Sequence, residues 1–172
     1  MILSKTPYRI SFFGGGTDFP DWYNNFGGQV ISSSIDKFCY VSVRDLPPFF
    51  KHKYRLVYSN TEEIKSLNQI KHPSIKQTLK YLKNKSSLEI QHIGDLPARS
   101  GIGSSSAFTV GLLNSLYNLN DFKPSKRRLA ENAIFIEQKM IKENVGSQDQ
   151  IATAFGGMNL IKFKKNNHFT IK

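Results

Sequence analysis

The sequence predicts an α+β fold, with strands mostly in the first part of the chain and helices mostly later. Residues 2–13 alternate between polar and apolar side chains, as in a half-buried strand. Beyond residue 103, by contrast, Phe108, Leu112 and Leu116 recur at helical spacing. The chain has 172 residues, of which 39% are hydrophobic, so it can form one domain with a proper core or two small lobes.

Alternating patterns and glycine or proline breaks define the elements of the first half. In order, these are a strand at 2–13, a break at the glycines 14–16, a short helix or turn at 18–26 closed by Gly27 and Gly28, two strands at 29–35 and 38–44 joined at Asp36 and Lys37, a loop at Pro47 and Pro48, and a strand at 54–59.

Helical periodicity dominates the second half, and there are no internal repeats. The expected elements are a helix at 73–84 opened by Pro73 and Ser74, a strand at 87–93, a helix from the turn at 99–108 to about residue 119, a long helix from near Pro124 and Ser125 to about 143, a short helix at 146–155, and closing strands at 157–163 and 168–172.

The charge balance is strongly basic, with 24 Lys and Arg against 13 Asp and Glu and a formal net charge of +11. Such a surplus suits an anionic partner: a nucleotide, a sugar phosphate, a nucleic acid or a membrane surface. The basic residues are spread along the chain, however, so ordinary solvated faces explain most of them, and no nucleic-acid motif accompanies them. We therefore expect neither a nucleic acid nor a membrane as partner.

Cysteine usage and the N-terminus indicate a cytoplasmic protein. Cys39 is the single cysteine, so no internal disulfide can form, and it is expected to be a buried small hydrophobe. Four scattered histidines give no zinc pattern. Lys5 and Arg9 interrupt the apolar N-terminus, which is therefore not a signal peptide, and no apolar run approaches the ~20 residues of a membrane span.

The stretch RSGIGSSSAF, residues 99–108, is the strongest candidate for a binding site. It joins a predicted strand to a predicted helix, and free N–H groups at a helix N-terminus favour an anion. Gly101 and Gly103 would let a phosphate approach the main chain, and the serines that follow offer hydroxyl groups. The alternative is simply a well-capped core helix. No Gly-Lys-Ser/Thr follows the stretch, so it is not a Walker loop. The other glycine run, GGGTDF at residues 14–19, is not a dinucleotide fingerprint, because residue 19 is Phe where a third glycine is needed.

Two carboxylates in the later helices are candidate functional groups. Glu137 falls within an apolar stripe of the long helix, where it is either a rim residue reaching water or a metal ligand whose charge a cation compensates. Asp149 is placed in the first turn of a helix by the capping-box spacing of Ser147 and Gln150. There it either compensates the helix dipole or meets a substrate hydroxyl.

Arg9 is the one charge in the second half of the first strand, and Asp18 follows the glycines 14–16. Arg9 is either a surface residue of an edge strand or a functional cation, and Asp18 is either a turn residue or a hydroxyl-binding carboxylate. An anion-binding turn, a metal carboxylate, a second carboxylate and an arginine are together the parts that phosphoryl transfer needs.

Three motifs resemble those of the GHMP kinases (galacto-, homoserine, mevalonate and phosphomevalonate kinases). They are TPYRISFFGGGTDFPDWY at the N-terminus, DLPARSGIGSSSAF in the middle, and NVGSQDQIATAFGG near the end. The resemblance implies the N-terminal, ATP-binding domain of that family, which is similar to domain 2 of ribosomal protein S5, over residues 1–172. Within the family, RISFFGGGTDFPDWY most resembles bacterial D-glycero-D-manno-heptose 7-phosphate kinases, which phosphorylate the anomeric hydroxyl.

The resemblance also implies site residues for an ATP- and Mg²⁺-dependent sugar kinase. Asp149 matches the catalytic aspartate and Arg9 the basic residue beside it, while Ser105 and Glu137 match the Mg²⁺ ligands. The ATP phosphate loop corresponds to Pro97, Arg99, Ser100, Gly101, Ile102, Gly103, Ser104, Ser105 and Ser106. The sugar or sugar-phosphate substrate is expected at Gly15, Gly16, Thr17 and Asp18.

Two departures from the family pattern qualify the resemblance. Galactokinases have Gly-Glu-His before Thr-Asp, whereas this chain has three glycines at 14–16, so galactose is not the expected sugar. The glycine-rich third motif of the family's C-terminal domain is missing, and we therefore expect that lobe to be absent. A non-catalytic binding module or regulator of the same fold is the alternative function. An apolar wall left exposed would favour a homodimer.

Overall fold

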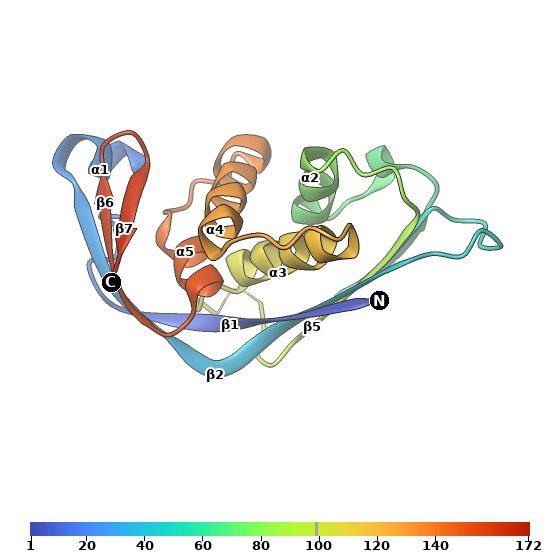
Figure 1. Cartoon of the computed structure of the whole chain (residues 1–172), viewed down its shortest axis with the longest axis horizontal. Helices are drawn as coiled ribbons and strands as arrows, with labels where there is room; N and C mark the ends of the chain where they lie inside the picture. The colour runs from blue at the N-terminus through green and yellow to red at the C-terminus, as the bar shows by residue number, and fades with distance from the viewer. Residues whose placement is uncertain (99) are drawn as a thin grey trace.

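A seven-stranded sheet supports the helices, and the computed structural model describes residues 1–98 and 100–172. The strands are β1 (Ile2–Phe13), β2 (Gly28–Asp45), β3 (Tyr54–Val57), β4 (Thr61–Ile64), β5 (Leu88–Gly94), β6 (Met158–Lys164) and β7 (His168–Ile171). The helices are α1 (Pro20–Phe26), α2 (Pro73–Tyr81), α3 (Ser104–Leu119), α4 (Lys126–Phe135) and α5 (Gln148–Phe155), with a 3-10 turn at Leu67–Gln69 and a π-helical turn at Ile136–Ile141. Helices α2 to α5 lie on one side of the sheet, whose ends curve toward them (Figure 1).

Strand β2 is the central strand, and it is continuous from Gly28 to Asp45. The prediction of two strands joined at Asp36 and Lys37 is wrong. A register shift in the pairing with β1 lies there instead, between the partners Pro7–Phe38 and Arg9–Ser34. A bulge of this kind bends a strand without ending it.

Each half of β2 has its own partner on the side away from β1. Residues 39–45 pair with β5, and residues 28–33 pair with β6, both antiparallel. The strand order is β4-β3-β5-β2-β6-β7, and β3 and β5 run parallel. The bend of β2 thus marks the boundary between the two halves of the sheet (Figure 1).

The main core lies between α2, α3 and the sheet half that contains β3 and β5. Its largest fully buried side chains include Tyr54, Leu56, Leu79, Leu88 and Leu112. Cys39 is also in this cluster and is fully buried, as the sequence predicts. A second cluster joins α5 to β6 and β7, and a third joins α3 to α4. Within the described residues, no helix is both long enough and apolar enough to cross a membrane.

Two further elements differ from the expected ones. The hairpin strand β4 was not predicted, because its buried residue is Glu62, whose carboxylate accepts from the Tyr58 hydroxyl at 2.8 Å and the Lys71 N–H at 2.9 Å. The long helix predicted to end near 143 is α-helical only to Phe135 and then continues as the π-helical turn, which ends at Lys142 with φ +65°. Glu137 lies in that turn. π-Helical turns are frequent at functional sites.

Candidate functional site

The turn between β5 and α3 is held against β1 by Arg9. Gly101 and Gly103 both have positive φ, +73° and +72°, which glycine adopts without the steric cost of a side chain. The Arg9 backbone N–H donates to the Ile102 carbonyl at 3.1 Å, and its Nη1 donates to the Gly101 carbonyl at 2.8 Å. Helix α3 begins directly after Gly103 at Ser104. The predicted strand-to-helix turn is therefore present, with its N–H groups at the helix N-terminus.

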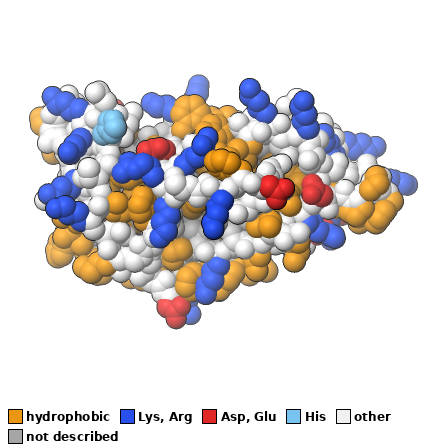
Figure 2. All heavy atoms as spheres, in the orientation of Figure 1, with side chains coloured by type: hydrophobic (Ala, Val, Ile, Leu, Met, Phe, Trp, Pro, Cys, Tyr) orange, Lys and Arg blue, Asp and Glu red, His pale blue; other side chains and the backbone are white. Residues whose placement is uncertain are grey.

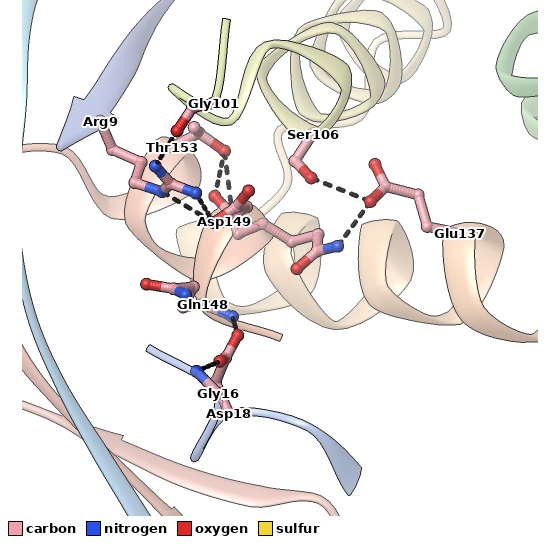
Figure 3. Close-up of polar contacts among 10 residues, drawn as sticks. Arg9, Gly16, Asp18, Gly101, Ser106, Glu137, Gln148, Asp149 and Thr153 are labelled. Carbon is pink, nitrogen blue, oxygen red and sulfur yellow. Dashed lines mark hydrogen bonds and ion pairs between the residues drawn. The ribbon is translucent and has the colours of Figure 1, made fainter. Parts of the chain in front are cut away.

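Arg9 also forms an ion pair with Asp149, which comes from the first turn of α5 (Figure 3). Nε donates to Oδ1 of Asp149 at 2.7 Å, and Nη2 lies 2.5 Å from the same oxygen. The two side chains are 10% and 27% exposed. Burial raises the pKa of Asp149, and the neighbouring guanidinium opposes that rise. Arg9 is therefore a buried partner of the acid and not a surface residue.

Asp149 lies against the turn itself as well as against Arg9. A Cβ placed on Gly103 would lie 3.4 Å from Oδ2 of Asp149 and 3.3 Å from Cγ of Arg9. The turn, the acid and the arginine therefore pack closely around residue 103, where the positive φ favours glycine. Among the described residues, hydrogen bonds reach Oδ1 and leave Oδ2 facing the turn.

Glu137 is buried, 1% exposed, so the alternative of a rim residue reaching water is wrong. Its Oε2 accepts from the Ser106 hydroxyl at 2.9 Å and from Nε2 of Gln150 at 2.5 Å, whereas Oε1 has no partner among the described residues. Burial raises the pKa of Glu137 to about 7. Ser105, the hydroxyl matched to it by sequence, is exposed, so the contact seen here is with Ser106.

The oxygen donors around Glu137 fit a hard cation such as Mg²⁺. Oε1 of Glu137 and the amide oxygen of Gln150 are both buried without a partner among the described residues, and the Ser106 hydroxyl lies beside them. Mg²⁺ accepts such oxygen ligands, with water and phosphate oxygens completing its shell. Over residues 1–98 and 100–172, no group of three or more His, Cys, Asp or Glu side chains is placed to hold a metal. Glu137 would thus serve with non-protein oxygens, as is usual for Mg²⁺ at phosphates.

The loop 14–18 is fastened to the beginning of α5. Asp18 is 1% exposed, and its carboxylate accepts from the N–H groups of Gly16 at 3.0 Å and Gln148 at 3.2 Å. A Cβ on Gly146 would overlap that carboxylate, so glycine is needed there. The Thr17 hydroxyl donates to the Gly14 carbonyl at 2.7 Å.

The capping box expected from Ser147 and Gln150 is not formed. Ser147 makes no side-chain cap, and the Gln150 amide donates to Glu137 instead. Asp18, from a distant part of the chain, caps the N–H of Gln148 in its place. Asp149 nevertheless lies in the first helical turn, as the sequence predicts.

Two cavities open on either side of the turn. The first, of about 500 Å³, is lined by Arg9, Ile10, Ser11, Phe12, Phe13, Gly14, Gly15, Gly101, Ile102 and Gln148. The second, of about 340 Å³, is lined by Tyr8, His72, Pro73, Ser74, His92, Leu96, Ala98, Ser104, Ser105, Phe108 and Glu143. The turn therefore separates two spaces of ligand size.

Aromatic rings characterise the second cavity. The rings of His72 and His92 lie 4.9 and 5.0 Å from that of Phe108. Burial lowers the pKa of both histidines, so they are neutral at physiological pH. Sequence reasoning missed these two histidines, because they come from separate elements and match no motif.

The remaining predicted residues take simpler places. The Pro97 carbonyl accepts from the Ser100 hydroxyl at 2.6 Å, while Arg99 lies outside the described residues. Gly15 lines the first cavity, and Ser104 lines the second. Sequence reasoning also gave no functional role to Gln148 or Gln150. On the face seen in Figure 2, Lys and Arg side chains are spread among apolar and polar ones, as their scatter along the sequence predicts.

Comparisons with known proteins agree with this architecture. Residues 73–157 match the model of the GHMP kinases N terminal domain. D-glycero-alpha-D-manno-heptose 7-phosphate kinase of Campylobacter jejuni is 23% identical over 182 residues, covering 99% of this chain and 53% of that protein. Galactokinase of Pyrococcus furiosus is 27% identical, covering 94% of this chain and 46% of its own length. The chain thus spans about half the length of these curated relatives.

Several solved structures are similar over the whole of this chain. Among them is a D-glycero-D-manno-heptose 1-phosphate kinase from Bacteriodes thetaiotaomicron, with a TM-score of 0.90 and 24% identity, covering 100% of this chain and 59% of that one. At this identity the likeness establishes the fold.

Proposed function

Since the chain carries a GHMP kinase N-terminal domain, we propose that it serves in the ATP- and Mg²⁺-dependent phosphorylation of a sugar hydroxyl. The acceptor we propose is a heptose 7-phosphate or a related sugar, phosphorylated at its anomeric hydroxyl. The relatives named above are sugar kinases, and two of the three carry heptose phosphates in their names.

The observation that carries the proposal is the contact of Arg9 and Asp149 with the turn before α3. The glycines of that turn expose backbone N–H groups at a helix N-terminus, where the phosphates of ATP would bind. Arg9 would stabilise the charge that develops on the transferred phosphoryl group. Asp149 lies next to both, and the acceptor hydroxyl would approach it there.

Asp149 would orient the acceptor and take its proton. Arg9 occupies Oδ1 at 2.7 Å, so Oδ2 remains to accept the hydrogen bond of the sugar hydroxyl. As the hydroxyl oxygen bonds to the γ-phosphorus, its proton passes to this carboxylate and ADP leaves with the electron pair of the broken P–O bond. A pKa raised by burial makes the carboxylate a better proton acceptor.

Glu137, with a hydroxyl of the serine run, would hold Mg²⁺. Ser105 is the ligand implied by the sequence match, and Ser106 is the hydroxyl in contact with Glu137. Bound there, the metal would neutralise the negative charge of the phosphates.

The two cavities suit the two substrates. In the first, Phe12 and Phe13 are 52% and 72% exposed beside Gly14 and Gly15. A sugar could pack against these apolar rings and form hydrogen bonds with the open backbone of the glycines. In the second, His72 and His92 pack on the buried ring of Phe108 and would offer flat, neutral surfaces for the adenine base. Thr17 and Asp18 would shape the sugar site through the loop that they hold.

Calorimetric titration of Mg·ATP into the chain and its Gly103→Val variant tests the proposal. A valine there would block the approach of phosphate, and we expect the affinity to fall at least tenfold. Gly157→Val is the matched control, because Gly157 also has positive φ, +77°, and lies outside the turn. Equal affinity in all three proteins would contradict the phosphate-binding role of the turn. Mg·ATP binding without sugar-dependent ADP release would favour a non-catalytic binding module instead.

A further inference from the structure

The side chain of Gln148 lines the first cavity together with Arg9 and has no part in the contacts between Arg9 and Asp149. It is the first residue of α5 and directly precedes Asp149. Arg9, Gly15 and Gly101 line the same cavity. Figure 3 shows the Gln148 amide extending away from the helix axis, near the loop that contains Gly16 and Asp18.

The amide oxygen of Gln148 is buried without a hydrogen-bond donor among the described residues. Such an oxygen has lost its hydrogen bonds to water without forming others, which costs free energy unless a ligand supplies the donor. The helix end does not need this side chain, because Asp18 already caps the Gln148 N–H at 3.2 Å.

The loop opposite leaves space beside the amide nitrogen of Gln148. Residue 15 is glycine, and even a Cβ there would come no closer than 3.9 Å to Nε2 of Gln148. A side chain larger than methyl at this position would cover the amide. The glycine and the glutamine together therefore form one polar recess next to the acid.

We infer that Gln148 binds a second hydroxyl of the acceptor, adjacent to the one that Asp149 activates, so that the acceptor must present two neighbouring hydroxyls. This inference rests on the proposed function. An amide suits the role because its oxygen accepts from a hydroxyl and its nitrogen donates to the same oxygen atom. Being neutral, it adds no charge beside Asp149. For phosphorylation at the anomeric position, the second hydroxyl is that on C2 of the sugar.

The test compares D-glycero-D-manno-heptose 7-phosphate with its 2-deoxy analogue, each titrated into the chain in the presence of Mg²⁺ and a non-hydrolysable ATP analogue. Wild type is expected to bind the parent sugar about tenfold more tightly than the 2-deoxy sugar. Gln148→Met has similar length but no polar atoms, so it should lose about tenfold for the parent and nothing for the analogue. Gln148→Glu retains acceptor oxygens and should keep part of the preference.

Each other outcome has a distinct meaning. If Gln148→Met still prefers the parent sugar, Gln148 does not bind that hydroxyl and the inference is wrong. An equal loss for both sugars would indicate a purely structural role and also overturn it. If wild type binds neither sugar while binding the ATP analogue, the acceptor assignment of the proposed function fails, and the inference fails with it.

Discussion

Replacing Glu137 by glutamine is expected to stabilise this chain at neutral and alkaline pH, in the absence of metal. The carboxyl group is 1% exposed, and only one of its oxygens has hydrogen-bond partners. Glutamine keeps an acceptor oxygen for Ser106 and Gln150 while removing the buried charge. The folded variant therefore does not bear the free-energy cost of ionising a buried carboxyl group, which the folded wild type bears at neutral and alkaline pH.

The magnitude follows from the pKa of Glu137, which burial raises from 4.5 to about 7. Between these values the native state binds more protons than the unfolded state, so the free energy of unfolding falls as pH rises through this window. Relative to acid pH, this pKa difference lowers the free energy of unfolding by about 3 kcal/mol at pH 8 and by under about 1 kcal/mol at pH 5. The stabilisation by Glu137→Gln should thus be about 2–3 kcal/mol larger at pH 8 than at pH 5.

Urea unfolding followed by circular dichroism, in metal-free buffer at both pH values, measures this difference. Glu131→Gln on α4 is the matched control, since the Glu131 side chain is 52% exposed. This substitution should change the free energy of unfolding by the same amount at both pH values. Equal free-energy changes at pH 5 and pH 8 for Glu137→Gln would refute the reasoning. They would mean that Glu137 is ionised in the native protein with its charge already compensated.

The remaining predictions concern backbone positions and the thiol. Gly146→Ala should lower the free energy of unfolding by about 2–4 kcal/mol, because its Cβ overlaps the Asp18 carboxylate, whereas Gly15→Ala should change it by under about 0.5 kcal/mol; similar melting temperatures would contradict this. Gly103→Ala should cost about 1–2 kcal/mol in urea unfolding for the strain at φ +72°, and an unchanged midpoint would show that the turn adapts. Burial raises the pKa of the Cys39 thiol to about 12, so it should react with a disulfide reagent at pH 8 only when urea unfolds the chain, and rapid labelling of the native protein would show β2 opening.

Short-range patterns were sufficient for much of the fold. The turn before α3 and the start of that helix at Ser104 follow from glycine and serine chemistry that acts over a few residues. The prediction of a break between two strands at Asp36 and Lys37 was wrong, because two polar residues can occupy either a turn or a bulge. Only the pairing with β1 decides between the two.

The candidate site depends more on long-range contacts, which sequence patterns do not reveal. Arg9 and Asp149 are separated by 140 positions, so their pairing could be expected only from the family resemblance. The π-helical turn around Glu137 was missed because its apolar residues also fit ordinary helical spacing. No sequence pattern marks Gln148 as functional. It becomes a candidate only because the fold leaves its amide oxygen without a hydrogen-bond partner among the described residues.

The shared strand β2 has a consequence for the order in which this protein folds. Residues 39–45 of β2 can pair with β5 once residue 94 has been synthesised. Residues 28–33 can pair with β6 only after residues 158–164 have been synthesised. Contacts this distant in sequence are costly in loop-closure entropy and slow to form. We therefore expect a growing chain to acquire the glycine turn and α3 early, and to bring Asp149 against Arg9 only after β6 has been synthesised. A nascent chain would then pass through a stage at which the anion-binding turn exists and the acid that completes the site does not.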